Sequence, residues 1–194
     1  MKNFISALAL LISLSLFSCS ENKVEVSKQE IAGMRTTAME FMKDLKGVLV
    51  SQIQTNGVLQ AVSVCSDTAQ VLTNNFGLQK GVYIKRVSFK NRNENNFPDD
   101  FERKVLNKFE LQHQNKELNT DTEHAEVVQE GEFKYVRYLK PILVQAECLN
   151  CHGGEMDIMP EVKQLIANTY PNDRAVGYKV GDLRGAVSLK KVIE

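Results

Sequence analysis

The sequence lacks an excess of either charge. Its 24 Lys and Arg residues balance 24 Asp and Glu residues in a chain of 194. No sustained basic stripe is present that could neutralise a phosphate backbone, so nucleic acid is not expected as a partner. Repeats, a hydrolytic triad and a phosphate-binding glycine loop are also missing from the sequence. With 43% hydrophobic and 25% charged residues, the chain fits one globular domain with a sizeable core.

Long apolar runs are missing too, except for one stretch at the N-terminus. Residues 4–17 form this stretch, Lys2 precedes it, and small residues surround positions 18 and 19, as is typical of a cleavable export signal. The stretch is too short to span a bilayer comfortably. We therefore expect residues 1–18 to be a signal peptide and the mature protein to be exported.

The end of this stretch has a further pattern. Leu16-Phe17-Ser18-Cys19 resembles the lipobox of bacterial lipoproteins, in which the cysteine after the cleavage site carries the lipid, although Phe17 stands where a small residue is usual. The resemblance implies lipidation of Cys19, a polar tether over residues 19–28 and a domain over residues 29–194. The protein would then be a membrane-anchored lipoprotein facing the periplasm or the cell surface. The alternative is a plain secretory signal in which Cys19 is incidental.

Apolar periodicity predicts helices first and strands afterwards. Pro141 is expected at a sheet edge or a bulge. This order predicts an α+β domain built on one antiparallel sheet with a long N-terminal helix. The predicted elements are helices over residues 28–53 and 58–75 separated at Asn56-Gly57, a strand at 83–89, a loop at 91–100, a helix reaching about residue 114, strands at 125–129 and 132–145, a loop at 147–154, a helix at 159–170, and two strands within 175–193 that turn at Gly181-Asp182.

Cysteine is scarce, yet two of the four cysteines form a recognisable motif. Cys148-Leu149-Asn150-Cys151-His152 has the C-x-x-C-H pattern of c-type haem attachment. Two thiols three positions apart can form thioethers with the two haem vinyl groups, and the adjacent imidazole can bind the iron from the same side. The motif predicts one covalent haem c, attached at Cys148 and Cys151, with His152 as an iron ligand.

Two other interpretations of the motif are weaker. A C-x-x-C pair can form a redox-active disulfide, but that chemistry is typical of a helix N-terminus in a βαβ context. Here a strand containing Pro141 precedes the motif and Gly153-Gly154 follows it. A tetrahedral zinc site would need a fourth ligand grouping that the spacing does not offer.

The second iron ligand matters because the axial ligands set the redox potential and the access to the iron. Met156 and Met159 follow His152 too closely to reach the opposite haem face, and His113 and His124 lie in polar surroundings. Cys65 lies on the apolar face of a predicted helix, where an inert buried thiol is the alternative to a ligand. The residues alone leave this choice open.

Several further segments have the order and spacing of a known family. They are Ala61 to Cys65, Arg86 to Ser88, Arg92 to Asn96 with Pro98-Asp99 after it, Phe101-Glu102, Tyr138 to Pro141, Cys148 to Gly153, Gly177-Tyr178 and Gly181 to Ala186. Together they resemble the PAS-like c-type haem proteins first described in cyanobacteria, a domain that also occurs in front of bacterial sensor kinases. The resemblance covers most of the chain after about residue 31.

The resemblance implies a PAS-like antiparallel sheet with flanking helices, and iron ligation by His152 and Cys65. Arg86 and Arg92 are candidates for contacts to the haem propionates because a guanidinium matches carboxylate geometry; the alternative is a structural role in the Asn-rich loop. Glu94 stands where the family usually has a proline.

Three functions are compatible with such a site. A redox or small-ligand sensor would use a Cys65 thiolate, which lowers the potential and can leave the iron on reduction; its signalling partner would be a separate protein. A monohaem electron carrier with an unknown redox partner would need two stable axial ligands. Peroxidase-like catalysis is least favoured because Cys65 would block the open iron face. We expect a sensor, with the electron carrier as the alternative and no enzyme activity.

Overall fold

The computed structural model describes residues 25–193, except for the side chains of Cys65 and Asp67. The predicted signal peptide and Cys19 therefore lie outside the described residues. The elements are α1 (Lys28–Lys80), β1 (Tyr83–Val87), η1 (Glu94–Asn96), α2 (Asp100–Gln114), β2 (His124–Glu130), β3 (Phe133–Leu143), η2 (Ala146–Cys148), α3 (Leu149–His152), α4 (Pro160–Thr169) and β4 (Leu183–Val192), where η marks a single 3-10 turn. Between residues 25 and 193, none of the helices combines the length and the apolar character needed to cross a membrane.

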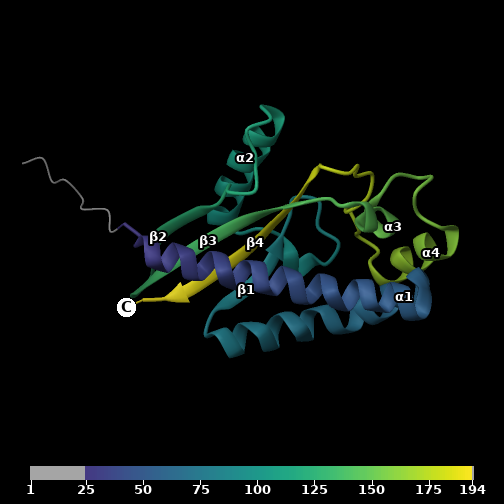
Figure 1. Cartoon of the computed structure of the whole chain (residues 1–194), viewed down its shortest axis with the longest axis horizontal. Coiled ribbons are helices and arrows are strands. Elements are labelled where there is room, and N and C mark those ends of the chain that lie inside the picture. Colours follow the sequence, from purple (N-terminus) through teal and green to yellow (C-terminus); the bar gives the residue numbers. More distant parts are fainter. Residues whose placement is uncertain (1–24, 194) are drawn as a thin grey trace, which may run out of the picture.

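The long helix α1 is a helical hairpin. Gly57 interrupts it with a φ of 79°, which glycine adopts without a Cβ clash, and the chain folds back there so that the two arms lie side by side (Figure 1). Phe41 and Phe76 join the arms with ring centroids 5.4 Å apart, and Lys80 pairs with Glu40 at 2.6 Å. The predicted break at this glycine is confirmed, whereas the second arm continues beyond the predicted end at residue 75.

The sheet has four antiparallel strands in the order β1-β4-β3-β2. The last strand, β4, pairs with β1 on one side and with β3 on the other. Pro141 of β3 lies opposite Ala186 of β4, beyond the point where β2 stops pairing, at His124 opposite Leu139. At Pro141, β3 thus has a strand partner on one side only, as expected for a proline in a strand.

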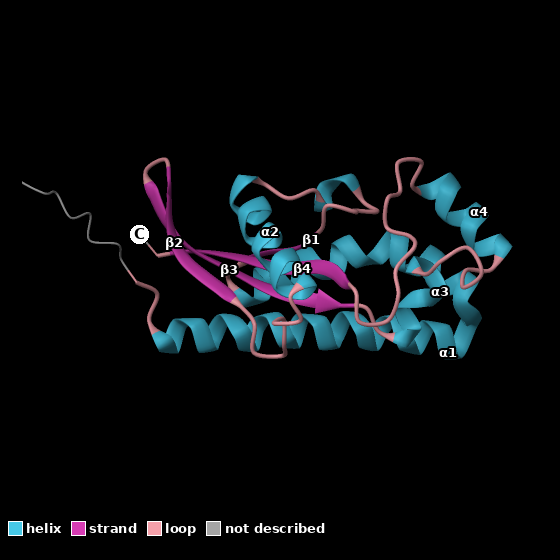
Figure 2. Cartoon of the chain, turned by 90° about the horizontal axis from the view of Figure 1, so that it is seen from above, coloured by secondary structure: helices cyan, strands magenta, loops and turns pink. Residues whose placement is uncertain are grey.

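The two faces of the sheet support different cores. Figure 2 shows α1 running along one side of the sheet. The core on this side contains Met34, Ala38, Phe41, Ile84, Val136, Tyr138, Val187 and Leu189. The core beneath α2, on the other face, contains Val87, Val105, Leu106, Phe109, Leu139 and Ala186. The helix α4 packs against the bend of α1 through Val62, Ile158, Val162 and Ile166.

A buried ionic cluster fixes α2 to its face of the sheet. Glu102 of α2 and Arg137 of β3 are only 1% and 3% exposed. Glu102 pairs with Lys85 at 2.9 Å and accepts a hydrogen bond from the Ser188 hydroxyl at 2.7 Å, and Arg137 pairs with Asp99 at 2.7 Å. Charges buried this deeply need such partners. The ion pairs and the hydrogen bond therefore hold α2 against this face of the sheet.

The predicted α+β architecture, with one antiparallel sheet, flanking helices and a long N-terminal helix, is confirmed. Two local predictions near the C-terminal end are wrong. Only one strand, β4, forms within residues 175–193, because the backbone N–H groups of Gly177 and Tyr178 donate to the carbonyls of Gly153 and His152 instead of to a strand. The loop predicted over residues 147–154 contains the helical turn α3.

Candidate functional site

A cavity of about 650 Å³ lies between α1 and the sheet. This volume falls within the range of roughly 300–1,000 Å³ that is typical of small-molecule and cofactor sites. The other walls come from β1 and the loop after it, the end of β3, the turn α3 and the start of β4. Both arms of α1 form an apolar wall, which contains Met42, Leu45, Leu49, Ile53, Ala61, Val62 and Ala69.

The C-x-x-C-H motif forms another part of the cavity lining. Cys148 ends the turn η2, and Cys151 and His152 belong to α3, so the motif occupies about one helical turn. Residues three apart lie on the same face of such a turn, and Cys148, Cys151 and His152 all line the cavity. The structure thus brings the three residues of the motif to one cavity wall.

The imidazole of His152 has a defined orientation and protonation state. Its Nδ1 lies 2.7 Å from the carbonyl oxygen of Ala175. Because a carbonyl only accepts, Nδ1 carries the proton and Nε2 keeps its lone pair. Burial, followed by the nearby cations Arg184 and Arg92, holds the pKa of His152 well below its usual value. The ring is therefore neutral and offers Nε2 as a metal ligand, in the arrangement that metal-binding histidines use.

Three consecutive carbonyl groups at the end of α3 receive hydrogen bonds from other parts of the chain. Arg92 Nη2 donates to the carbonyl of Cys151 at 2.6 Å. The backbone N–H groups of Tyr178 and Gly177 donate to His152 at 3.0 Å and to Gly153 at 2.7 Å. Carbonyls at a helix end need such partners, and these bonds fix the motif against residues 173–178.

Arg92 and Arg86, the arginines predicted at the site, both line the cavity. The Nη2 of Arg92 also bonds Asp173 at 3.1 Å, so this guanidinium joins the loop after β1 to two other segments. This contact is the kind expected if Arg92 has a structural role in the Asn-rich loop. Arg86 stands on β1 opposite Val187 of β4, on the α1 side of the sheet.

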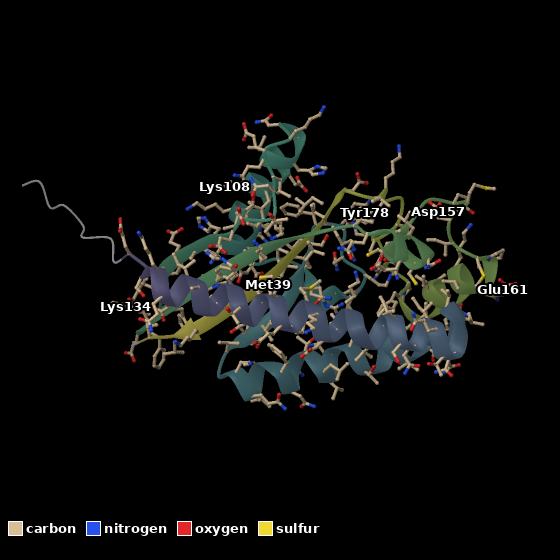
Figure 3. All side chains as sticks on the ribbon, in the orientation of Figure 1. Met39, Lys108, Lys134, Asp157, Glu161 and Tyr178 are labelled. Carbon is tan, nitrogen blue, oxygen red and sulfur yellow. The ribbon has the colours of Figure 1, made fainter. Side chains whose placement is uncertain are left out.

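Tyr178 packs against His152 and lies close to two cations. Its ring meets the imidazole edge-on, with an interplanar angle of 89° and centroids 6.5 Å apart. Lys90 Nζ lies 4.3 Å from the Tyr178 ring centroid and the guanidinium carbon of Arg184 lies 5.3 Å from it. Figure 3 shows Tyr178 at the same end of the molecule as α3. These cation–π contacts hold the ring against the histidine.

The predicted candidates for a second iron ligand lie in different places. His113 lies near the Gly181 carbonyl and His124 near the Glu126 carboxylate, and neither lines the cavity. Met156 and Met159 are 95% and 48% exposed and lie outside the cavity lining as well.

Cys65 stands on the second arm of α1, one helical turn from Ala61 and one from Ala69, which both line the cavity. Its side chain lies outside the described part of the chain. Among the side chains that the structure does describe, no group of three or more His, Cys, Asp and Glu forms a site for a bare metal ion.

Sequence reasoning missed several residues that line or support the cavity. Met39 and Met42 line it from the first arm of α1, far from the motif in sequence. Arg184 lines it from the start of β4, and Tyr178 supports His152. The only signal for the last two was their presence in segments shared with the haem family, Gly177-Tyr178 and Gly181 to Ala186.

The sequence model of the Tll0287-like family matches residues 21–191. The chain belongs to the Tll0287-like family. A similar solved structure is the crystal structure of the cyanobacterial haem-protein Tll0287, which is 26% identical over 87% of this chain and 98% of that chain, with a TM-score of 0.65. No curated protein matches the chain. The family resemblance predicted from the motifs is therefore confirmed, and residues 21–191 correspond to the Tll0287-like domain.

Gly153 and Gly154, which follow the motif, allow a test of whether the close packing at the end of α3 contributes to stability. A Cβ on Gly153 would lie 2.7 Å from the Leu149 carbonyl oxygen and 2.5 Å from the Asp157 Cβ, whereas a Cβ on Gly154 would meet only the Asp157 carboxylate at 3.3 Å. We expect Gly153→Ala to lower the free energy of unfolding by about 1–3 kcal/mol, as overpacking does. Denaturant unfolding measures the change.

Gly154→Ala is the matched control for this change. It adds the same methyl group one position later, and we expect an effect of less than about 0.5 kcal/mol, as at tolerant surface positions. Equal destabilisation by the two variants would show that the close approach of Gly153 to α3 does not matter.

Proposed function

We propose that this Tll0287-like protein binds one covalent haem c in the cavity and acts as a redox or small-ligand sensor. The observation that carries the proposal is that Cys148, Cys151 and His152 line the same cavity wall, with the imidazole neutral and oriented. The similar solved structure is that of a haem-protein. When bound, a haem supplies an iron that exchanges one electron and binds small gases.

The residues present fit a haem in size, polarity and donor chemistry. The apolar wall of α1 suits the porphyrin faces, and the volume falls in the cofactor range. Cys148 and Cys151 supply two thiols for thioether bonds, and His152 supplies Nε2. Among the described residues of the lining, the one acidic residue, Glu147, pairs with Lys46 at 2.5 Å. The arginines in the lining give the cavity a surplus of positive charge, which suits a ligand that carries carboxylates.

Covalent attachment can be tested by replacing both thiols. We expect the exported protein to give a pyridine haemochrome spectrum of the c type, and Cys148→Ser with Cys151→Ser to abolish haem that survives denaturing electrophoresis. Cys65→Ser is the control, since it removes a thiol outside the motif and should leave attachment intact. Covalent haem in the double variant would contradict the proposal.

Cys65 is the proposed second axial ligand. Its place on α1 between Ala61 and Ala69 supports this role, because both neighbours line the same cavity as the motif. A cysteine thiolate donates charge to ferric iron and lowers the potential. It binds ferrous iron less strongly, so Cys65 is a ligand that can leave on reduction, which is the property a sensor needs.

The ligand is tested by the ferric electron-spin-resonance spectrum. We expect a low-spin thiolate signal in the wild type and its loss in Cys65→Ala, with Met42→Leu as the control because Met42 also supplies sulfur to the cavity. An unchanged spectrum in Cys65→Ala would reject Cys65. The reduced wild type should bind carbon monoxide, whereas a reduced form that binds none would favour the electron carrier over the sensor.

We also propose that the protein is exported and anchored in the membrane by a lipid on Cys19. The lipobox-like segment Leu16-Phe17-Ser18-Cys19 supports this proposal. Cys19→Ala should move the protein from the membrane fraction to the soluble fraction after cell fractionation, while Ser20→Ala should leave it in the membrane fraction. Retention of Cys19→Ala in the membrane would contradict the lipid anchor.

A further inference from the structure

Arg184 occupies a fixed position in the cavity wall. It is the second residue of β4 and lines the cavity. Its Nη1 donates to the carbonyl of Lys90 at 3.0 Å, and its guanidinium lies over the ring of Tyr178 with 5.3 Å between the guanidinium carbon and the ring centroid. A backbone acceptor on one side and an aromatic face on the other restrict the plane of the group.

The surroundings of Arg184 hold more positive than negative charge. Among the described residues, no Asp or Glu forms an ion pair with it. The nearby Asp173 pairs with Arg92 instead, at 3.1 Å, and Lys90 adds a further cation close to the Tyr178 ring. Burial lowers the pKa of Arg184 below its ordinary value. A partly buried charge without a counter-charge is costly, so the local structure favours an anion beside Arg184.

Arg92, which the sequence predicts as a propionate contact, differs from Arg184 because a carboxylate pairs with it. Arg92 already donates from Nη2 to the Cys151 carbonyl and to the Asp173 carboxylate, which pairs its charge, while its buried Nε has no hydrogen-bond partner among the described residues. Among the described residues, the hydrogen-bond partners of the Arg184 guanidinium are the neutral carbonyl of Lys90 and the side chain of Tyr178, and neither is a carboxylate. Arg184 thus has both the charge and the donors to bind a planar carboxylate through two parallel N–H···O bonds.

We propose that Arg184 binds a carboxylate of the cavity ligand, and that this carboxylate is a haem propionate. The assignment rests on the proposed function, because only a bound haem brings a propionate into the cavity. A free carboxylate from solution has the same chemistry and is the other source of such a group. The assignment adds Arg184, whose charge is not paired with a carboxylate of the described residues, to the candidate propionate contacts Arg86 and Arg92.

The test compares three variants of the haem-loaded protein. Arg184→Gln removes both the charge and the paired N–H donors of the guanidinium. Arg184→Lys keeps the charge but cannot form two parallel N–H···O bonds. Arg103→Gln is the matched control, since Arg103 is an exposed residue of α2 that pairs with Asp100 on the other face of the sheet. The readouts are the propionate bending band in the resonance Raman spectrum and the midpoint potential.

We expect both Arg184 variants to shift the propionate band and Arg103→Gln to leave it unchanged. The midpoint potential should fall in Arg184→Gln, because a lost cation destabilises the more negative ferrous state, and should fall less in Arg184→Lys. A propionate band and a potential in Arg184→Gln that equal those of Arg103→Gln would overturn the assignment. So would a wild-type potential that follows the acetate concentration of the buffer, since that behaviour assigns the site to a free carboxylate.

The same samples separate this assignment from the proposed function. Covalent haem in the wild type and in Arg184→Lys means that haem binding holds, whatever the Raman result. A wild type without covalent haem would refute the proposed function itself.

Discussion

The hydrogen bonds to the carbonyls of Cys151, His152 and Gly153 are the constraint on which the site depends. The turn α3 is only four residues long, and an isolated turn of this length is unstable because helix nucleation is unfavourable. Donors from Arg92, Gly177 and Tyr178 satisfy the carbonyls that the short helix leaves open. The C-x-x-C-H motif is therefore local in sequence, whereas its geometry is set by segments far along the chain.

The division of the sheet into two faces explains where a cavity can form. On the α2 face, the cluster around Glu102 and Arg137 and the apolar core leave the surface between helix and sheet closed. On the other face, α1 supplies two apolar arms, which the chain reversal at Gly57 sets side by side. The cavity opens between these arms and the part of the sheet, on β1 and β4, that bears Arg86 and Arg184. One sheet thus separates a rigid face from a ligand-binding face.

Much of the fold was predictable because its signals are local. The spacing of apolar residues predicts the long helix, and Asn56-Gly57 predicts its bend. The C-x-x-C-H motif is recognised from the identity of its residues alone. Residues 175–180 were predicted as a strand because turn residues followed them, yet their N–H groups bond α3. The roles of Tyr178 and Arg184 could not be predicted either, since they depend on contacts between β4, the loop after β1 and α3. Tertiary contacts override local preference at such positions.

The strand order has a consequence for how the molecule assembles. β4, the last strand of the described residues, lies between β1 and β3, and it also carries Arg184 and Gly185 into the cavity wall. At Gly185 the two backbones approach so closely that a Cβ would lie 2.1 Å from the Val87 carbonyl oxygen. Before β4 arrives, β1 has no partner and the cavity has no floor, and closing so long a loop is slow. The final strand therefore completes the sheet and the cavity wall in the same step, because its first residues pair with β1 and β3 and also line the cavity.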